Sequence, residues 1–166
     1  MDFKSLFKFD RAHRYFSLLL AFNCFLIALV VYAWSEGHVA TVFAADQTGF
    51  MIHLIGTIGT MGIVFGLFKS WQVSCGQTDI SASYPIMRLF PEISTGLGIL
   101  GTVWGIILMS KNIAASGGTA TIIVVMGGLN LALYTTLVGL FFALWIMANN
   151  AVVNSQTIYR ENHAGS

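Results

Sequence analysis

The stretch GLGILGTVWGIILMS, from Gly96 to Ser110, decides the fold class, because it holds four glycines and no charged side chain. It belongs to one of four uncharged runs, at residues 15–34, 50–68, 93–110 and 120–148. Each run is about long enough to cross ~30 Å of hydrocarbon at ~1.5 Å per residue. Backbone groups cannot stay unpaired in lipid, so each run is expected to be a helix. The sequence therefore predicts an all-α integral membrane protein with four transmembrane helices.

The composition supports this class and excludes others. Hydrophobic residues make up 56% of the 166 residues and charged residues 9%, which is not the make-up of a water-soluble domain. A net charge of +1 leaves no basic surface for nucleic acid, and the few carboxylates lack metal-ligand spacing. We therefore expect a protein that is not an enzyme and that holds neither a metal nor a cofactor.

The distribution of basic residues predicts the orientation. In a four-span arrangement only Lys111 falls on one side, and the other seven Lys and Arg residues share the opposite side: Lys4, Lys8, Arg11, Arg14, Lys69, Arg88 and Arg160. The side rich in basic residues is expected to be the cytoplasm. Residues 1–14 are then a cytoplasmic segment, residues 15–166 form a single membrane domain, and both termini lie inside.

The loops follow from this orientation. Residues 35–49 form an external loop, and residues 69–91 form a cytoplasmic loop that ends where Pro91 opens the third helix, since proline suits a first helical turn. The pair Gly117 and Gly118 closes the outer turn between the third and fourth helices. The fourth run is longer than one crossing needs, so this helix is expected to tilt or to extend into the cytoplasm.

Small residues recur on one face of each of the last two helices. On the third helix they are Gly98, Thr102 and Gly105, and on the fourth Ala132, Thr136, Gly139 and Ala143. Helices in lipid associate by close packing, which small residues permit. The spacing predicts a hairpin that packs closely against something, and it leaves open whether the partner surface belongs to the same chain or to another copy.

The strings GLGILGTVWGII and GLNLALYTTLVGLFFALW, joined by a short outer turn, resemble the signature hairpin of the MotA/TolQ/ExbB family of ion-driven stator proteins. The resemblance covers roughly residues 95–148, about a third of the chain. In this family a pentamer of such chains surrounds a dimer of single-span partner helices, and ion flow between them drives motion. The resemblance thus implies a homo-oligomer, driven by ions and in the first place by protons, in a bacterial inner membrane, with an ExbD, TolR or MotB-like partner that carries a membrane aspartate.

The same resemblance assigns roles to individual residues. It implies an ion path lined by hydroxyl and amide groups, at Thr95, Thr102, Asn130, Thr135 and Thr136. It implies contacts between helices and with the partner at Gly98, Gly101, Gly105, Ala132, Gly139 and Ala143. A threonine hydroxyl can hydrogen-bond a carboxylic acid or a hydrated ion in transit.

Several positions depart from the family pattern. A glutamate of the ExbB and TolQ branches is replaced by Leu131, and two prolines of the family are replaced by Thr95 and Trp145. The pore helices carry no acidic or basic side chain, so the titrating group is expected to come from the partner. His53 is the one candidate within a span, and an interfacial role suits it better. The alternative function is a non-conducting, structural four-helix scaffold or assembly protein.

Overall fold

The computed structural model describes residues 11–45, 50–75, 84–117 and 122–164. The helices are α2 Arg11–Ser35, α3 His38–Ala45, α4 Met51–Ser74, α5 Tyr84–Ala115 and α6 Ile122–Ala164. Among the described residues, α2, α4, α5 and α6 are the helices long and apolar enough to cross a membrane. The prediction of an all-α chain with four such helices is confirmed.

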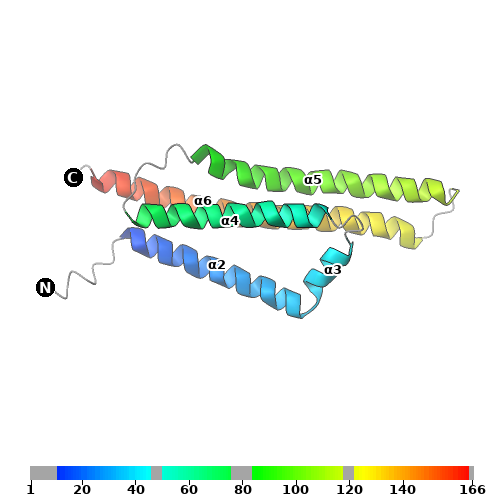
Figure 1. Ribbon diagram of the computed structural model, residues 1–166, viewed down its shortest axis with the longest axis horizontal. Coiled ribbons are helices and arrows are strands. Elements are labelled where there is room, and N and C mark those ends of the chain that lie inside the picture. The colour runs from blue at the N-terminus through cyan, green and yellow to red at the C-terminus, as the bar shows by residue number, and fades with distance from the viewer. Residues whose placement is uncertain (1–10, 46–49, 76–83, 118–121, 165–166) are drawn as a thin grey trace.

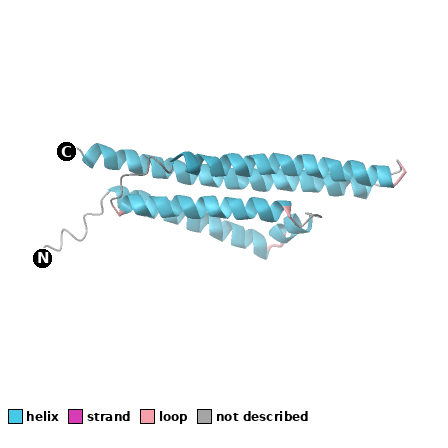
Figure 2. Cartoon of the chain, turned by 45° about the horizontal axis from the view of Figure 1, so that its top comes forward, coloured by secondary structure: helices cyan, strands magenta, loops and turns pink. Residues whose placement is uncertain are grey.

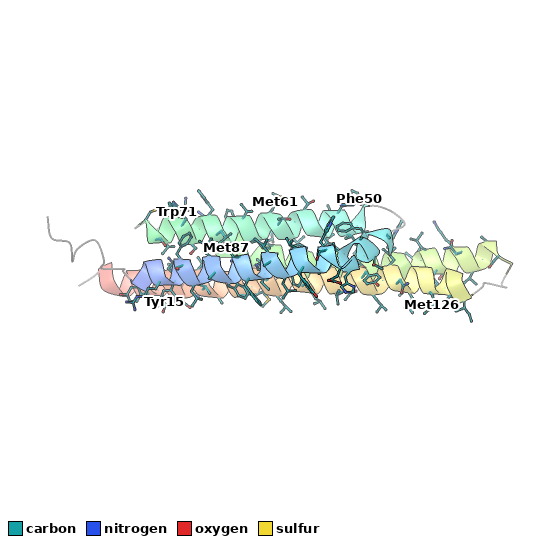
Figure 3. The ribbon with its side chains drawn as sticks, turned by 90° about the horizontal axis from the view of Figure 1, so that it is seen from below. Tyr15, Phe50, Met61, Trp71, Met87 and Met126 are labelled. Atoms are coloured by element: carbon teal, nitrogen blue, oxygen red, sulfur yellow. The ribbon has the colours of Figure 1, made fainter. Side chains whose placement is uncertain are left out.

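The helices form two antiparallel pairs that lie along each other. Figure 1 shows α4 between α2 and α5, and α4 packs more extensively on α6 and α5 than on α2. Figure 2 shows that α5 and α6 extend well beyond α3 and α4 at one end. In Figure 3, Met126 of α6 lies on this projecting part, past Phe50 at the start of α4. We call α5 and α6 together the hairpin.

The helices are longer than the apolar runs that predicted them. The expected external loop contains α3, and the expected cytoplasmic loop is mostly helical, because α4 continues to Ser74 and α5 begins at Tyr84. Apolar composition marks only the part of a helix suited to lipid, whereas backbone hydrogen bonding continues into the polar flanks. Two turns need glycine, since Gly37 and Gly117 have φ of 79° and 66°.

Pro91 does not open its helix, so the prediction that it stands in the first turn is wrong. It lies inside α5, where proline has no N–H to donate to the carbonyl of Met87 four residues earlier. The side-chain amide of Asn150 on α6 donates to that carbonyl instead, at 2.7 Å. The carbonyl that the proline frees therefore bonds α5 to α6, and this backbone group is not left unpaired.

Buried amides and hydroxyls fasten the other helices to α6. Asn23 on α2 and Asn149 on α6 exchange hydrogen bonds of 2.9 and 3.2 Å, and the Trp145 indole donates to the Asn23 carbonyl oxygen at 2.7 Å. On α4, the Ser70 hydroxyl donates to Gln156 at 2.8 Å. The Gln156 amide in turn donates to the Ser74 hydroxyl at 2.8 Å, so α6 is the common partner of every other long helix.

Candidate functional site

The hairpin is held together by direct contact between backbones. A Cβ atom added at Gly105 would lie 2.7 Å from the Gly128 carbonyl oxygen, and one added at Gly139 would lie 2.7 Å from the Ser94 carbonyl oxygen and 2.9 Å from the Gly98 Cα. No side chain fits at such separations. These glycines therefore pack the chain against itself, which is one of the two possibilities that their spacing left open.

Thr102 and Thr136 meet at this contact. Their hydroxyls hydrogen-bond each other across the hairpin, and both side chains are half-buried. Thr102 Oγ1 also lies 3.1 Å from the Gly98 carbonyl oxygen, and Thr136 Oγ1 lies 3.0 Å from that of Ala132. Each hydroxyl has one hydrogen. One hydrogen therefore bridges the two oxygens and the other reaches a helix carbonyl, while lone pairs remain available.

The remaining predicted site residues lie in different surroundings. Thr135 is fully buried, donates to its own helix, and fills the space beside Gly101. Thr95 is half-buried and donates to the Pro91 carbonyl oxygen at 2.9 Å. Asn130 is exposed. Of the small residues, Ala132 and Ala143 are both buried. The structure thus brings Thr102 and Thr136 together and places Thr135 between the helices.

Thr102 and Thr136 stand at the edge of a hairpin surface that neither α2 nor α4 covers, and we call this surface the open flank. On α5, Arg88 and Thr95 precede Thr102 at intervals of seven residues, so they share its side of the helix. On α6, Ala143 is buried, and the Asn150 side chain lies close to Gly66 of α4, so neither extends the open flank along that helix. α4 packs on the opposite side of α5, where Phe90 lies against Gly62.

A groove of about 680 Å³ runs along the open flank, toward the start of α5. Its lining comes from α5 and α6 alone: Arg88, Pro91, Glu92, Thr95, Gly96, Ile99, Met147, Asn150, Ala151 and Asn154. Both Arg88 and Glu92 are exposed. The groove combines the two charged side chains with amides and a hydroxyl, so it is chemically distinct from the apolar surface of the rest of the hairpin.

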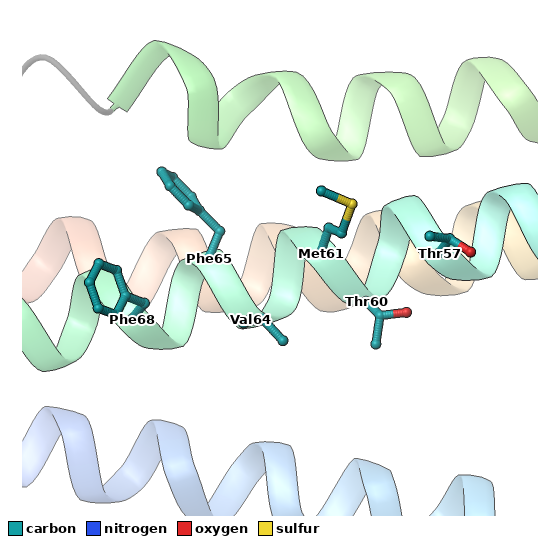
Figure 4. Close-up of a pocket in the computed structure, with 6 residues that line it drawn as sticks. All are labelled: Thr57, Thr60, Met61, Val64, Phe65 and Phe68. Atoms are coloured by element: carbon teal, nitrogen blue, oxygen red, sulfur yellow. The ribbon is translucent and has the colours of Figure 1, made fainter.

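A second concavity lies on α4 and has a different character. Figure 4 shows its six lining residues, all from α4: Thr57, Thr60, Met61, Val64, Phe65 and Phe68. The hydroxyls of Thr57 and Thr60 donate to carbonyls of their own helix. This apolar face suits lipid or another protein surface and offers no polar chemistry.

Sequence reasoning missed the polar residues that fasten the helices. Asn23 stands alone in an apolar run, and Asn149 and Asn150 directly follow another such run. An isolated amide in an apolar helix indicates an interhelical hydrogen bond, and this signal was available. Their partners depend on the packing of the helices, which the sequence does not give.

The family model described as "MotA/TolQ/ExbB proton channel family" matches residues 70–162, more than half of the chain. The chain belongs to this family. The match covers the hairpin with Thr102, Thr136 and the groove, whereas α2, α3 and most of α4 lie outside it. The predicted family is therefore confirmed.

Two relatives support the same family. The chain is 30% identical to the Zorya protein ZorA of Escherichia coli over 115 residues, which is 68% of this chain and 20% of ZorA. It is 47% identical to the biopolymer transport protein exbB1 of Vibrio cholerae over 58 residues, which is 35% of this chain and 25% of exbB1. The matched parts thus span a quarter or less of each relative. No solved structure matches the chain.

Proposed function

We propose that this protein is the channel subunit of an ion-driven, energy-transducing complex of a bacterial inner membrane. Several copies, most simply five, form a ring around a dimer of single-span partner helices, and both termini of the chain lie in the cytoplasm. The observation that carries the proposal is the pair of hydroxyls from Thr102 and Thr136, held half-exposed at the edge of the open flank. Membership of a proton channel family supports it.

The hydroxyl pair can serve a carboxyl group in both of its protonation states. In the structure, both hydroxyl hydrogens of the pair already make hydrogen bonds, and the free lone pairs can accept a hydrogen bond from a neutral carboxylic acid. If one hydroxyl leaves its helix carbonyl, at a cost of about 1 kcal/mol, it can donate to a charged carboxylate. A charged carboxylate in hydrocarbon is costly without such a donor. The partner's aspartate is thereby stabilised at this place in either state.

The titrating group must come from the partner. Between Gly96 and Ser110, and between Ile122 and Ala148, the hairpin has no acidic or basic side chain. Leu131, at the place of a family glutamate, is buried with 1% of its surface exposed. The second candidate function, a scaffold that passes no ions, draws its support from this apolar replacement.

The test is ion flux through the complex of this chain and its partner in lipid vesicles. Thr102→Val with Thr136→Val keeps the side-chain shape but removes both hydroxyls, and the complex should assemble with flux reduced about tenfold or more, as expected for losing roughly 1.5 kcal/mol of hydrogen bonding to a charge. Thr57→Val, which removes an exposed hydroxyl on α4, is the control and should retain flux.

The same experiment separates the two functions. Normal flux in the double valine variant would remove these threonines from the ion path. A complex that assembles in its native form but passes neither protons nor sodium ions would favour the scaffold.

A further inference from the structure

The concavity on α4 is an apolar surface that the other described helices leave uncovered. Met61, Val64 and Phe68 each expose more than half of their surface there, and Figure 4 shows them along one face of the helix. The hydroxyls of Thr57 and Thr60 donate to carbonyls of their own helix. The volume of about 600 Å³ lies within the ~300–1,000 Å³ range of sites that hold a small molecule. The occupant must therefore be apolar where it lies against α4.

The concavity has the length of one leaflet of a bilayer. Its lining extends from Thr57 to Phe68, 11 residues apart, which is ~16 Å at ~1.5 Å per residue. Half of the ~30 Å hydrocarbon core is ~15 Å. α4 is long and apolar enough to cross the membrane, and Lys69, directly after Phe68, is its only Asp, Glu, Lys or Arg residue. The length therefore suits a single acyl chain that starts near Lys69.

Lys69 lies at the polar end of this concavity. Its ammonium nitrogen is 5.6 Å from the centroid of the Phe65 ring, and Phe65 is one of the lining residues. The ammonium donates one hydrogen bond, to the Gln72 side-chain oxygen at 2.9 Å. It has three hydrogens, and no carboxylate pairs with it in the part of the chain that the structure describes. Two donors therefore remain for an anion beside the apolar face.

The neighbouring helix adds positive charge at the same end. The rings of Phe16 on α2 and Trp71 on α4 lie 5.5 Å apart, and Figure 3 shows Tyr15 and Trp71 at a common end of the molecule. Arg14, next to Tyr15, is exposed. Neither α2 nor α4 contains an acidic residue. Basic side chains at the end of a membrane helix attract anionic lipid headgroups.

We propose that the concavity on α4 binds one anionic phospholipid. Its phosphate accepts hydrogen bonds from the Lys69 ammonium, and one acyl chain lies along α4 from Phe68 toward Thr57. In the orientation proposed above, this lipid belongs to the cytoplasmic leaflet. The site involves neither Thr102 nor Thr136, so it does not depend on ion flow.

Lys69 gives the site its preference for a negatively charged lipid. The headgroup of a zwitterionic lipid carries its own cation, which competes with the ammonium for the phosphate. An anionic headgroup has no such cation, and it gains from the charge of both Lys69 and Arg14. The methylene stem of Lys69 can remain against Phe65 while its ammonium reaches the phosphate.

Native mass spectrometry of the purified chain in detergent tests the preference for charge. The probes are phosphatidylglycerol, which is anionic, and phosphatidylcholine with the same acyl chains, which is zwitterionic. The native chain should retain at least fivefold more phosphatidylglycerol than phosphatidylcholine. Lys69→Gln should abolish this preference, and Lys69→Arg should keep it. Lys111→Gln, which removes an exposed lysine beyond the last apolar turns of α5, is the matched control and should leave it unchanged.

A second variant tests the place of the acyl chain. Val64 is 61% exposed and lies in the concavity, so Val64→Trp fills the space without disturbing the interior of the protein. It should lower the retention of both lipids at least fivefold and leave the mass of the protein assembly unchanged. Leu133→Trp, at a side chain of α6 that is 61% exposed and lies outside the concavity, is the control and should retain both lipids.

The other results contradict the proposal. Equal retention of the two lipids by the native chain, or an unchanged preference in Lys69→Gln, would show that Lys69 does not hold a headgroup. If Val64→Trp retains both lipids but reduces the mass of the assembly, a second copy covers this face instead. The proposed function is decided separately by ion flux, because none of these variants changes the threonine pair.

Discussion

The two halves of the hairpin are packed by opposite means. In the half near the 116–117 turn, Gly98, Gly105, Gly128 and Gly139 bring the two backbones into contact, and the threonine hydroxyls lie among them. In the half near the chain ends, amides take over, and Asn149, Asn150 and Gln156 connect α6 to α2, α5 and α4 in turn.

This difference separates two tasks. Contacts between glycines determine how closely two helices approach but hold their alignment along the helix axis only weakly. Each amide hydrogen bond, in contrast, joins one specific pair of atoms. The amide half therefore sets the register of all four long helices, and the glycine half sets only how closely α5 approaches α6. The threonine pair lies among the backbone contacts between α5 and α6, so its geometry depends chiefly on these two helices.

The largest effect is expected where the backbones touch. Gly139→Ala places a methyl group 2.7 Å from the Ser94 carbonyl oxygen and 2.9 Å from the Gly98 Cα, and neither atom can move without shifting α5. Overpacking of this kind costs about 2 kcal/mol or more, which unfolding in detergent would measure. The control is Gly96→Ala, whose added methyl meets no atom within 4 Å. Equal stability of the two variants would disprove the backbone contact.

A smaller loss is expected in the amide half. Asn149→Leu removes the paired bonds with Asn23, and interhelical hydrogen bonds in membranes contribute about 0.6 kcal/mol, rarely above about 1.7. We expect a loss of about 1 kcal/mol, measured in the same assay. Asn23→Leu should lower the free energy of unfolding less when it is added to Asn149→Leu than when it is made alone. Asn130→Leu, at an exposed asparagine of the other half, is the control and should change the stability little. Strict additivity of the Asn23 and Asn149 changes would contradict the coupling.

The smallest effect should be a gain. The Ser94 hydroxyl is fully buried and has no hydrogen-bond partner among the described residues. An unpaired buried hydroxyl costs about 1 kcal/mol, so Ser94→Ala should raise the free energy of unfolding by up to that amount. Ser70→Ala should lower it, because that hydroxyl donates to Gln156. A loss of stability in Ser94→Ala would mean that the hydroxyl has a partner in the assembly.

The sequence predicted the fold class, the four long apolar helices, and the family. Uncharged runs are direct consequences of the lipid solvent, and the glycine spacing predicted the hairpin. It did not predict that α5 begins at Tyr84, because a helix outside lipid can continue through polar residues such as Arg88 without any hydrophobic signal. The position of Pro91 was predicted wrongly for a related reason. Proline is tolerated within a helix when another side chain bonds the carbonyl that it leaves without a partner, here that of Met87, and the sequence does not show that Asn150 does so.

The candidate site was predictable in part. The hydroxyls of Thr102 and Thr136 were expected in an ion path, and the structure shows that they are neighbours across the hairpin. Thr135 could not be separated from Thr136 by residue type, and only the packing shows that it is buried against Gly101. The groove around Glu92 could not be predicted, because it lies between α5 and α6 on the side of α5 that α4 leaves uncovered, and the sequence does not show how α4, α5 and α6 pack.

The length of the hairpin makes this protein sensitive to bilayer thickness. At ~1.5 Å per residue, the 43 residues of α6 extend ~65 Å, whereas the 24 residues of α4 extend ~36 Å. The projecting part carries exposed apolar side chains, among them Ile106, Met126 and Leu133. In a thin bilayer these side chains meet water unless neighbouring copies cover them, and in a thick bilayer lipid covers them instead. For the ring proposed above, hydrophobic mismatch would then act on assembly itself: thinner membranes should favour the ring, and thicker membranes should favour separate subunits.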